Sequence, residues 1–234
     1  MYLRIRNLCG LLGILLPWIA LFAAASTPHE SPEWWWSISA TYHQSPVALV
    51  GVLVPACIVM MSYIGYNWTD NLITTLTGVF GLGIVLFPCK VSWIPDGTPV
   101  GFFQLPIEVS THIHTACALL FFVCTALNTL CQFTRHGDQL TERKKTRNTI
   151  YRICGWGMIG LLVLLILFSL LFGTPGWFVM IIEILLLHLF GFAWLVKGEF
   201  FPFLNDREDA EPPVTDPNFP IVRTAPTVRT EVTD

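Results

Sequence analysis

Two apolar runs decide the fold: residues 153–172 read ICGWGMIGLLVLLILFSLLF, and residues 177–196 read WFVMIIEILLLHLFGFAWLV. A helix needs about 20 mostly apolar residues to cross a hydrocarbon core of about 30 Å. Each run meets that requirement, and only a short connection separates them. The pair therefore predicts two neighbouring transmembrane helices.

Four further runs of this kind precede the pair, at residues 8–25, 47–66, 72–88 and 109–132. The run at 72–88 is the shortest, and its threonines make it the least hydrophobic. Hydrophobic residues make up 53% of the chain and charged residues 12%, whereas a soluble domain carries about a quarter charged residues. We expect an all-α fold, a polytopic transmembrane helix bundle with six spans in residues 1–199. Residues 200–234 are acidic and proline-rich, which predicts a flexible cytoplasmic tail.

The basic residues predict the orientation. With the N-terminus in the cytoplasm, 12 of the 13 Lys and Arg residues lie in cytoplasmic segments, and only Lys90 lies outside. This asymmetry is the one that membrane proteins show, and it places both termini in the cytoplasm. The first run has an alternative, because Arg4 and Arg6, an apolar stretch and the small residues 23–26 also resemble a cleavable signal peptide. Cleavage would leave five spans.

The loop at 26–46 carries the triplet Trp34, Trp35 and Trp36, followed by the sequence SISATYH at 37–43. Tryptophan concentrates at headgroup depth, so the triplet should hold this loop against the outer membrane interface. Asp70, in the short inner loop before the third run, has the residue type of a helix N-cap.

Ionisable groups inside a bilayer are costly and are therefore candidates for function. The spans contain four: His112, His114, Glu183 and His188. At about 100° per residue, His114 shares one face of its helix with other polar residues, and His112 lies on the opposite face, within reach of Glu108. The shared face should turn inward and comprises Ser110, His114, Cys117, Phe121, Thr125, Asn128 and Gln132. His188 lies well around its helix from Glu183, which favours a packing or interfacial role.

His114 and Glu183 should lie at similar depths below the outer surface, because each follows the outer end of its span by about two turns. His43 belongs to the loop just above them. We therefore expect a polar pocket that opens outward. Its candidate residues are Ser37, Ser39, Tyr42, His43, His114 and Glu183.

Three segments of the chain resemble a known group: Ser37–His43, Arg147–Gly155 and Gly191–Glu199. They are similar to a group of uncharacterised bacterial six-span integral membrane proteins. More distantly, the layout resembles the Frag/DRAM/Sfk-type membrane families, which also place a serine-containing motif after the first span. The resemblance implies a multi-pass protein of the bacterial inner (plasma) membrane, and it implies no particular reaction.

Three functions remain open, and the sequence does not decide whether the protein is an enzyme. The first is a lipid-binding, sensing or scaffold protein whose polar pocket holds a lipid headgroup or stiffens the bundle. The second is a membrane-embedded hydrolase of a lipid or amide, in which His43, His114 and Glu183 bind a metal or activate water. The third is a proton-coupled carrier that uses Glu183 and His114. The sequence specifies no cofactor and no oligomeric state, and its partner is the lipid bilayer rather than nucleic acid.

Overall fold

The computed structural model describes residues 2–28, 35–65, 67–135, 141–173 and 175–206. Six α-helices dominate it: α1 (Tyr2–Ala25), α2 (Pro46–Met61), α3 (Trp68–Leu86), α4 (Ile107–Leu127), α5 (Glu142–Phe172) and α6 (Gly176–Lys197). The short elements are the 3₁₀ helices η1 (Ser39–His43) and η3 (Pro202–Leu204), the π-helical turn η2 (Asn128–Gln132), and the antiparallel strands β1 (Pro99–Val100) and β2 (Leu105–Pro106). The expected all-α bundle is therefore confirmed.

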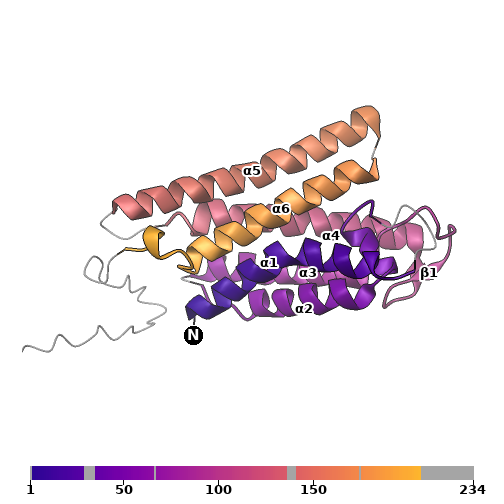
Figure 1. Ribbon diagram of the computed structural model, residues 1–234, viewed down its shortest axis with the longest axis horizontal. Coiled ribbons are helices and arrows are strands. Elements are labelled where there is room, and N and C mark those ends of the chain that lie inside the picture. The colour runs from indigo at the N-terminus through magenta and orange to yellow at the C-terminus, as the bar shows by residue number, and fades with distance from the viewer. Residues whose placement is uncertain (1, 29–34, 66, 136–140, 174, 207–234) are drawn as a thin grey trace, which may run out of the picture.

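The helices form a closed ring. Each helix packs against the next one along the chain, and α6 returns to pack against α1. The start of α1 meets the end of α6, where Arg6 donates a hydrogen bond to the Lys197 carbonyl at 3.3 Å. This is the terminal end of the bundle, and β1 lies at the opposite, hairpin end (Figure 1).

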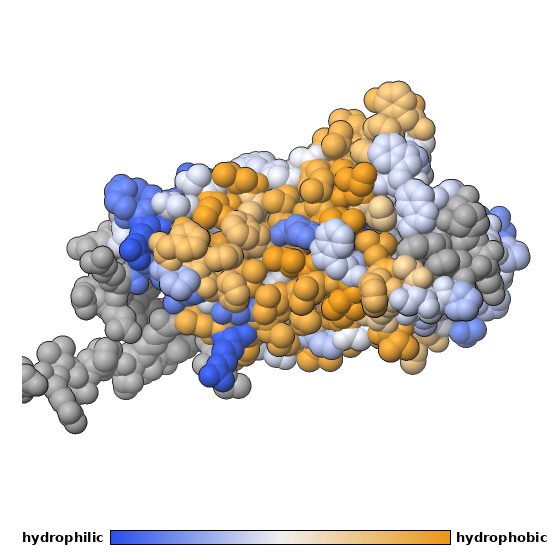
Figure 2. Space-filling model, in the orientation of Figure 1, coloured by the Kyte–Doolittle hydropathy of each residue, from blue (hydrophilic) through white to orange (hydrophobic). Residues whose placement is uncertain are grey.

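Among the described residues, five helices are long and apolar enough to cross a membrane: α1, α3, α4 together with η2, α5 and α6. Figure 2 shows hydrophobic residues across the middle of one face and hydrophilic residues toward its two ends. The chain is thus a multi-pass membrane protein. Helix α2 has only 16 residues, because it ends at Met61 and not at the predicted residue 66. The third run, expected to be the weakest, forms a 19-residue helix.

Two helix starts differ from the sequence-based expectation. Asn67, not Asp70, is the N-cap of α3, because its side chain accepts a hydrogen bond from the Asp70 N–H at 2.9 Å. Asp70 lies inside the first turn and is buried. Helix α5 begins at Glu142 rather than near 153, since Thr141 caps it by accepting from the Lys144 N–H at 3.0 Å. Residues 142–152, which are rich in Lys and Arg and precede the predicted span 153–172, are therefore the first turns of this helix.

Basic side chains bind main-chain carbonyls at the terminal end. Lys144 is buried and donates to the Phe133 carbonyl at 3.0 Å, just after the π-helical turn that continues α4. Arg147 donates to the Leu204 carbonyl at 2.7 Å and forms an ion pair with Asp206, which fixes η3 against α5. Positive charge near the carbonyl end of a helix is stabilising. Of the predicted tail, residues 207–234 lie outside the described residues.

Candidate functional site

The 37–43 segment folds into a compact turn at the hairpin end. The Ser37 hydroxyl accepts a hydrogen bond from the Ala40 N–H at 2.9 Å, and the Thr41 hydroxyl donates to the Ile38 carbonyl at 2.5 Å. Short polar side chains often bind nearby main-chain groups in this way and so stabilise turns. Two of the polar residues in this segment are therefore used to build the turn itself. Trp34 of the tryptophan triplet lies outside the described residues.

Glu183 of α6 holds this turn against the bundle. Its carboxylate accepts a hydrogen bond from the Ile38 N–H at 2.6 Å and one from the Ser39 hydroxyl at 3.3 Å. Hydrogen bonds to a charged acceptor are stronger than neutral ones, and they offset part of the cost of a carboxylate at this depth. The structure thus brings together Ser39 and Glu183, two of the six candidate pocket residues.

His43 lies on the other side of the turn and does not reach Glu183. Its Nε2 lies 2.8 Å from the Cys89 carbonyl oxygen, so the ring donates from Nε2. The ring edges of Tyr42 and Trp93 surround it, with centroids 5.5 and 6.5 Å away. Burial lowers the pKa of His43, and the bond to the carbonyl offsets only part of that effect. His43 is therefore neutral at physiological pH and attaches the turn to the segment after α3.

The Cys89 thiol is a poor nucleophile. Burial and the nearby Glu183 carboxylate raise the pKa of Cys89 to about 12. Because the thiolate is the reactive form, a thiol with this pKa stays protonated and inert at neutral pH. Cys89 contributes its main-chain carbonyl to the site, and its thiol lies beside the Ser37 side chain.

His114 faces inward, as predicted, but it has different partners from those expected. It is 6% exposed, and its Nδ1 lies 3.1 Å from the Ile84 carbonyl oxygen and 2.8 Å from that of Phe87. The ring thereby satisfies carbonyls at the C-terminal end of α3, which have no partner within the helix. Among the described residues no hydrogen bond joins His114 to Glu183, and the recorded partners of the His114 ring are the two carbonyls of Ile84 and Phe87.

The other two intramembrane histidines differ in their surroundings. His112 is exposed, as expected, but Glu108 accepts a hydrogen bond from the Gly97 N–H at 2.8 Å and forms no recorded pair with it. His188 accepts a hydrogen bond from the Trp18 indole at 3.1 Å, and its Nδ1 lies 2.7 Å from the Ile184 carbonyl oxygen. This pair joins α1 to α6, in agreement with a packing role for His188.

The metal set proposed from the sequence does not form. Among the residues that the structure describes, no three His, Cys, Asp or Glu side chains lie close enough together to hold a metal ion. His43 and His114 are directed at carbonyl oxygens of different residues, while Glu183 is directed at the turn. Two imidazoles and a carboxylate would have to converge on one point to ligate zinc.

An apolar cavity of about 40 Å³ lies beside Glu183. The other lining residues are Leu16, Ile38, Leu53, Ile84, Phe121, Phe122 and Leu187. The Glu183 oxygens are bound to the turn, so the surface of the cavity is almost entirely hydrocarbon. Of the six residues predicted to form a polar pocket, only Glu183 lines this cavity.

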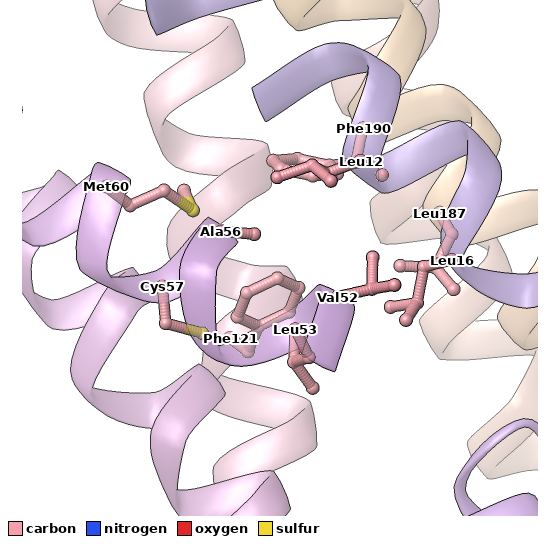
Figure 3. Close-up of a pocket in the computed structure, with 11 residues that line it drawn as sticks. Leu12, Leu16, Val52, Leu53, Ala56, Cys57, Met60, Phe121, Leu187 and Phe190 are labelled. Carbon is pink, nitrogen blue, oxygen red and sulfur yellow. The ribbon is translucent and has the colours of Figure 1, made fainter. Parts of the chain in front are cut away.

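A second, smaller cavity of about 10 Å³ lies farther into the bundle, toward Cys57 and Met60 (Figure 3). The two cavities share four lining residues: Leu16, Leu53, Phe121 and Leu187. The two cavities are therefore neighbours, and we call them together the apolar seam. Their lining residues come mainly from α1, α2, α4 and α6.

No protein-family model, curated protein or solved structure matches the chain. The site residues that sequence reasoning missed are Ile38, through its N–H, and the leucines and phenylalanines of the seam. Nothing in their residue types distinguishes them from ordinary core residues. Function therefore has to be inferred from the chemistry of the site.

Proposed function

We propose that the protein is a six-span membrane protein that binds a lipid-like amphiphile at the hairpin end of its bundle. The polar group of the ligand lies against Glu183, and its apolar part enters the seam. The observation that carries the proposal is Glu183, the one charged residue in the wall of an otherwise apolar cavity. A binding site of this kind, mostly apolar with one well-placed polar group, is typical of small-molecule pockets.

The presence of an acidic residue, Glu183, within a membrane helix supports a binding role over a purely structural one. An ionisable side chain in a membrane helix is costly, and a serine or threonine hydrogen bond would join the turn to α6 at lower cost. Carboxylate oxygens can accept about four hydrogen bonds, and groups of Ile38 and Ser39 supply three of them. On this proposal, the polar group of the ligand supplies another.

The proposed orientation places both termini in the cytoplasm and the hairpin end outside, in a bacterial inner membrane. Lys90 is exposed beyond the end of α3, whereas Arg143 and Arg147 lie at the start of α5. Single cysteines at positions 90 and 143, in a protein without its native cysteines, should react with a membrane-impermeant maleimide from opposite sides. Labelling of both from the same side would refute the topology. Labelling of position 90 from the cytoplasmic side would refute the proposal that the short helix α2 crosses the membrane.

Binding can be tested with gently purified protein and mass spectrometry of the lipid that it retains. Glu183→Gln should lose the bound lipid, because the carboxamide is neutral and a weaker acceptor. Ala56→Leu should also lose it, since Ala56 lines the inner cavity and a larger side chain would fill the seam. His188→Gln is the matched control, because it also replaces a titratable side chain of α6 by a carboxamide, at a position outside both cavities.

The proposal predicts that wild type and His188→Gln retain the same lipid and that Glu183→Gln and Ala56→Leu do not. Equal lipid retention by all four proteins would overturn it. The Ser39 hydroxyl donates to the Glu183 carboxylate, but both groups hold the turn against α6, so we rank the hydrolase and the carrier below the binding role.

A further inference from the structure

Several buried polar side chains toward the terminal end of the bundle carry an atom that has no hydrogen-bond partner among the described residues. They include Asn7, Asn128, Gln132, Asn148 and Trp194. Such atoms are rare in folded proteins, because they lose their bonds to water on folding and gain none in return. Their occurrence in one half of a membrane bundle therefore requires a physical explanation.

Asn128 is the clearest of these side chains. It is 1% exposed, and within the described part of the chain neither its amide nitrogen nor its amide oxygen has a partner. An amide can donate two hydrogen bonds and accept two, so all of this capacity is unused. Leucine has the same branching as asparagine and would fill the position without this cost. The amide is therefore not needed for packing alone.

The backbone at Asn128 is also unusual. Asn128 begins the π-helical turn η2, in which the Phe133 N–H donates to the Asn128 carbonyl at 3.1 Å. Single π-helical turns occur mostly at functional sites. Gln132 lies on the same side of this turn as Asn128, because four residues complete nearly one turn of a helix. Its Nε2 donates to the Thr69 hydroxyl at 3.4 Å, but its Oε1 is buried and has no partner in the described ranges.

Trp194 of α6 brings an indole N–H to the same region. It is fully buried, and its ring contacts that of Phe133, with centroids 5.2 Å apart. Phe133 directly follows η2, so the indole lies beside the turn that carries Asn128. A buried indole N–H usually has a hydrogen-bond partner, and this one has none among the groups that the structure describes.

The chemistry of these groups indicates what they bind. The Asn128 amide nitrogen and the Trp194 indole donate, whereas the amide oxygens of Asn128 and Gln132 accept. A cation would leave the donors unmatched, and an anion would leave the oxygens unmatched. Water both donates and accepts, and a buried water molecule makes about three hydrogen bonds.

We infer that η2 and Trp194 form a binding site for ordered water inside the terminal half of the bundle. The site is independent of the proposed lipid site. The Phe190 ring separates the two, because it contacts Trp194, with centroids 6.3 Å apart, and also lines the inner cavity of the apolar seam. On this inference the interior binds water toward the terminal end and is apolar along the seam.

The test is hydroxyl-radical footprinting by X-ray radiolysis of the wild-type protein in nanodiscs, with mass spectrometry as the readout. Radicals formed from an ordered water oxidise the side chain beside it, even where bulk solvent does not reach. Trp194 should therefore be oxidised several times faster than Met158, which is equally buried, belongs to the apolar core and is the more reactive residue type. Oxidation of Trp194 no faster than that of Met158 would overturn the inference.

Asn128→Leu tests the role of the amide. If the amide binds water, this variant should lose the fast oxidation of Trp194 and unfold at a lower temperature than the wild type. If the amide simply lacks a partner, removing it should raise the unfolding temperature, and that result would overturn the inference. Thr129→Val is the matched control in the same turn, because the Thr129 hydroxyl is bound to the Thr125 carbonyl, and Trp194 should be oxidised in it as in the wild type. The comparison of Trp194 with Met158 uses the wild-type protein, so it decides the question even if Asn128→Leu does not fold.

Discussion

The crossing of α1 and α6 offers the sharpest test of the fold, through the substitution Gly191→Ala. The two backbones approach closely where Gly191 of α6 meets Gly10 of α1. A Cβ atom added to Gly191 would lie 2.6 Å from the Gly10 carbonyl oxygen, 2.6 Å from Cγ1 of Ile14 and 2.9 Å from the Ile14 nitrogen. Two of these three atoms belong to the main chain, so a side-chain rotation cannot relieve the contacts. Small residues at such crossings are typical of membrane helices.

The cost follows from two opposing effects. Overpacking a close contact costs about 1–3 kcal/mol, and replacing glycine by alanine inside a helix returns up to about 1 kcal/mol. We therefore expect Gly191→Ala to lower the free energy of unfolding by about 1–2 kcal/mol. Gly51→Ala is the matched control in α2, because its added Cβ would have no atom within 4 Å. That variant should gain up to about 1 kcal/mol.

The measurement is thermal unfolding of both variants and the wild type in one detergent, followed by circular dichroism. Gly191→Ala should unfold several degrees below the wild type, and Gly51→Ala should not unfold below it. Equal transition temperatures for the two variants would refute the assigned crossing. The experiment also bears on the first run of the sequence, because a cleaved signal peptide would remove Gly10 and leave Gly191→Ala without cost.

Three further predictions concern the loops and caps. Asn67→Ala should destabilise α3 by about 1 kcal/mol in chemical unfolding, and Asn67→Asp should restore most of the loss because it keeps the cap acceptor. Burial would raise the pKa of Asp206, but hydrogen bonds from Thr141 and Arg147 outweigh burial and lower the pKa. Docking of η3 on α5 should therefore persist at neutral pH and weaken only when the pH falls below the ordinary Asp pKa of about 3.9. Asp206→Asn should weaken the docking of η3 at all pH values, by about 1 kcal/mol or less. Limited proteolysis should then cut the 198–206 segment faster in Asp206→Asn than in the wild type. Equal rates of cleavage in the two proteins would contradict the assigned ion pair. Because folding lowers the pKa of His43, the unfolded loop binds a proton more readily than the folded one. The free energy of unfolding should therefore fall as the pH drops through about 6.5. His43→Gln should show a smaller difference in unfolding temperature between pH 7.5 and pH 5.5 than the wild type does.

Much of the fold could be predicted from the sequence, because hydrophobic run length and helical periodicity act over a few residues. All six runs are helices, and the predicted inward face of α4 is buried from Ser110 to Gln132, with Cys117 only partly so. The errors lie at boundaries set by local polar contacts. The Thr141 cap extends α5 into the basic segment, and α2 ends early at Met61.

The candidate site was predictable only in part, because most partners of its polar side chains are main-chain groups. Glu183 binds the Ile38 N–H, His43 binds the Cys89 carbonyl, and His114 binds two carbonyls of α3. Every residue has these groups, so residue types cannot indicate which of them a side chain meets. The predicted pocket did include both Glu183 and Ser39, whose side chains are hydrogen-bonded in the structure. The depth of Glu183 below the outer end of its span made this contact with the outer loop predictable. The apolar seam left no sequence signal, because its leucines and phenylalanines look like any core.

The position of Ile38 connects the proposed ligand to the surface of the protein. Ile38 lines the cavity with its side chain and donates its N–H to Glu183, and it belongs to the turn that covers the hairpin end. A ligand that reaches the carboxylate therefore contacts both the group that holds the turn and a residue of the turn itself. By thermodynamic linkage, any change that the ligand makes in the docking free energy of the turn appears equally in its own affinity. On the proposed function, occupancy of a site within the bilayer is thus read out at the hairpin end as a change in the 37–43 turn, and this signal requires no chemical reaction.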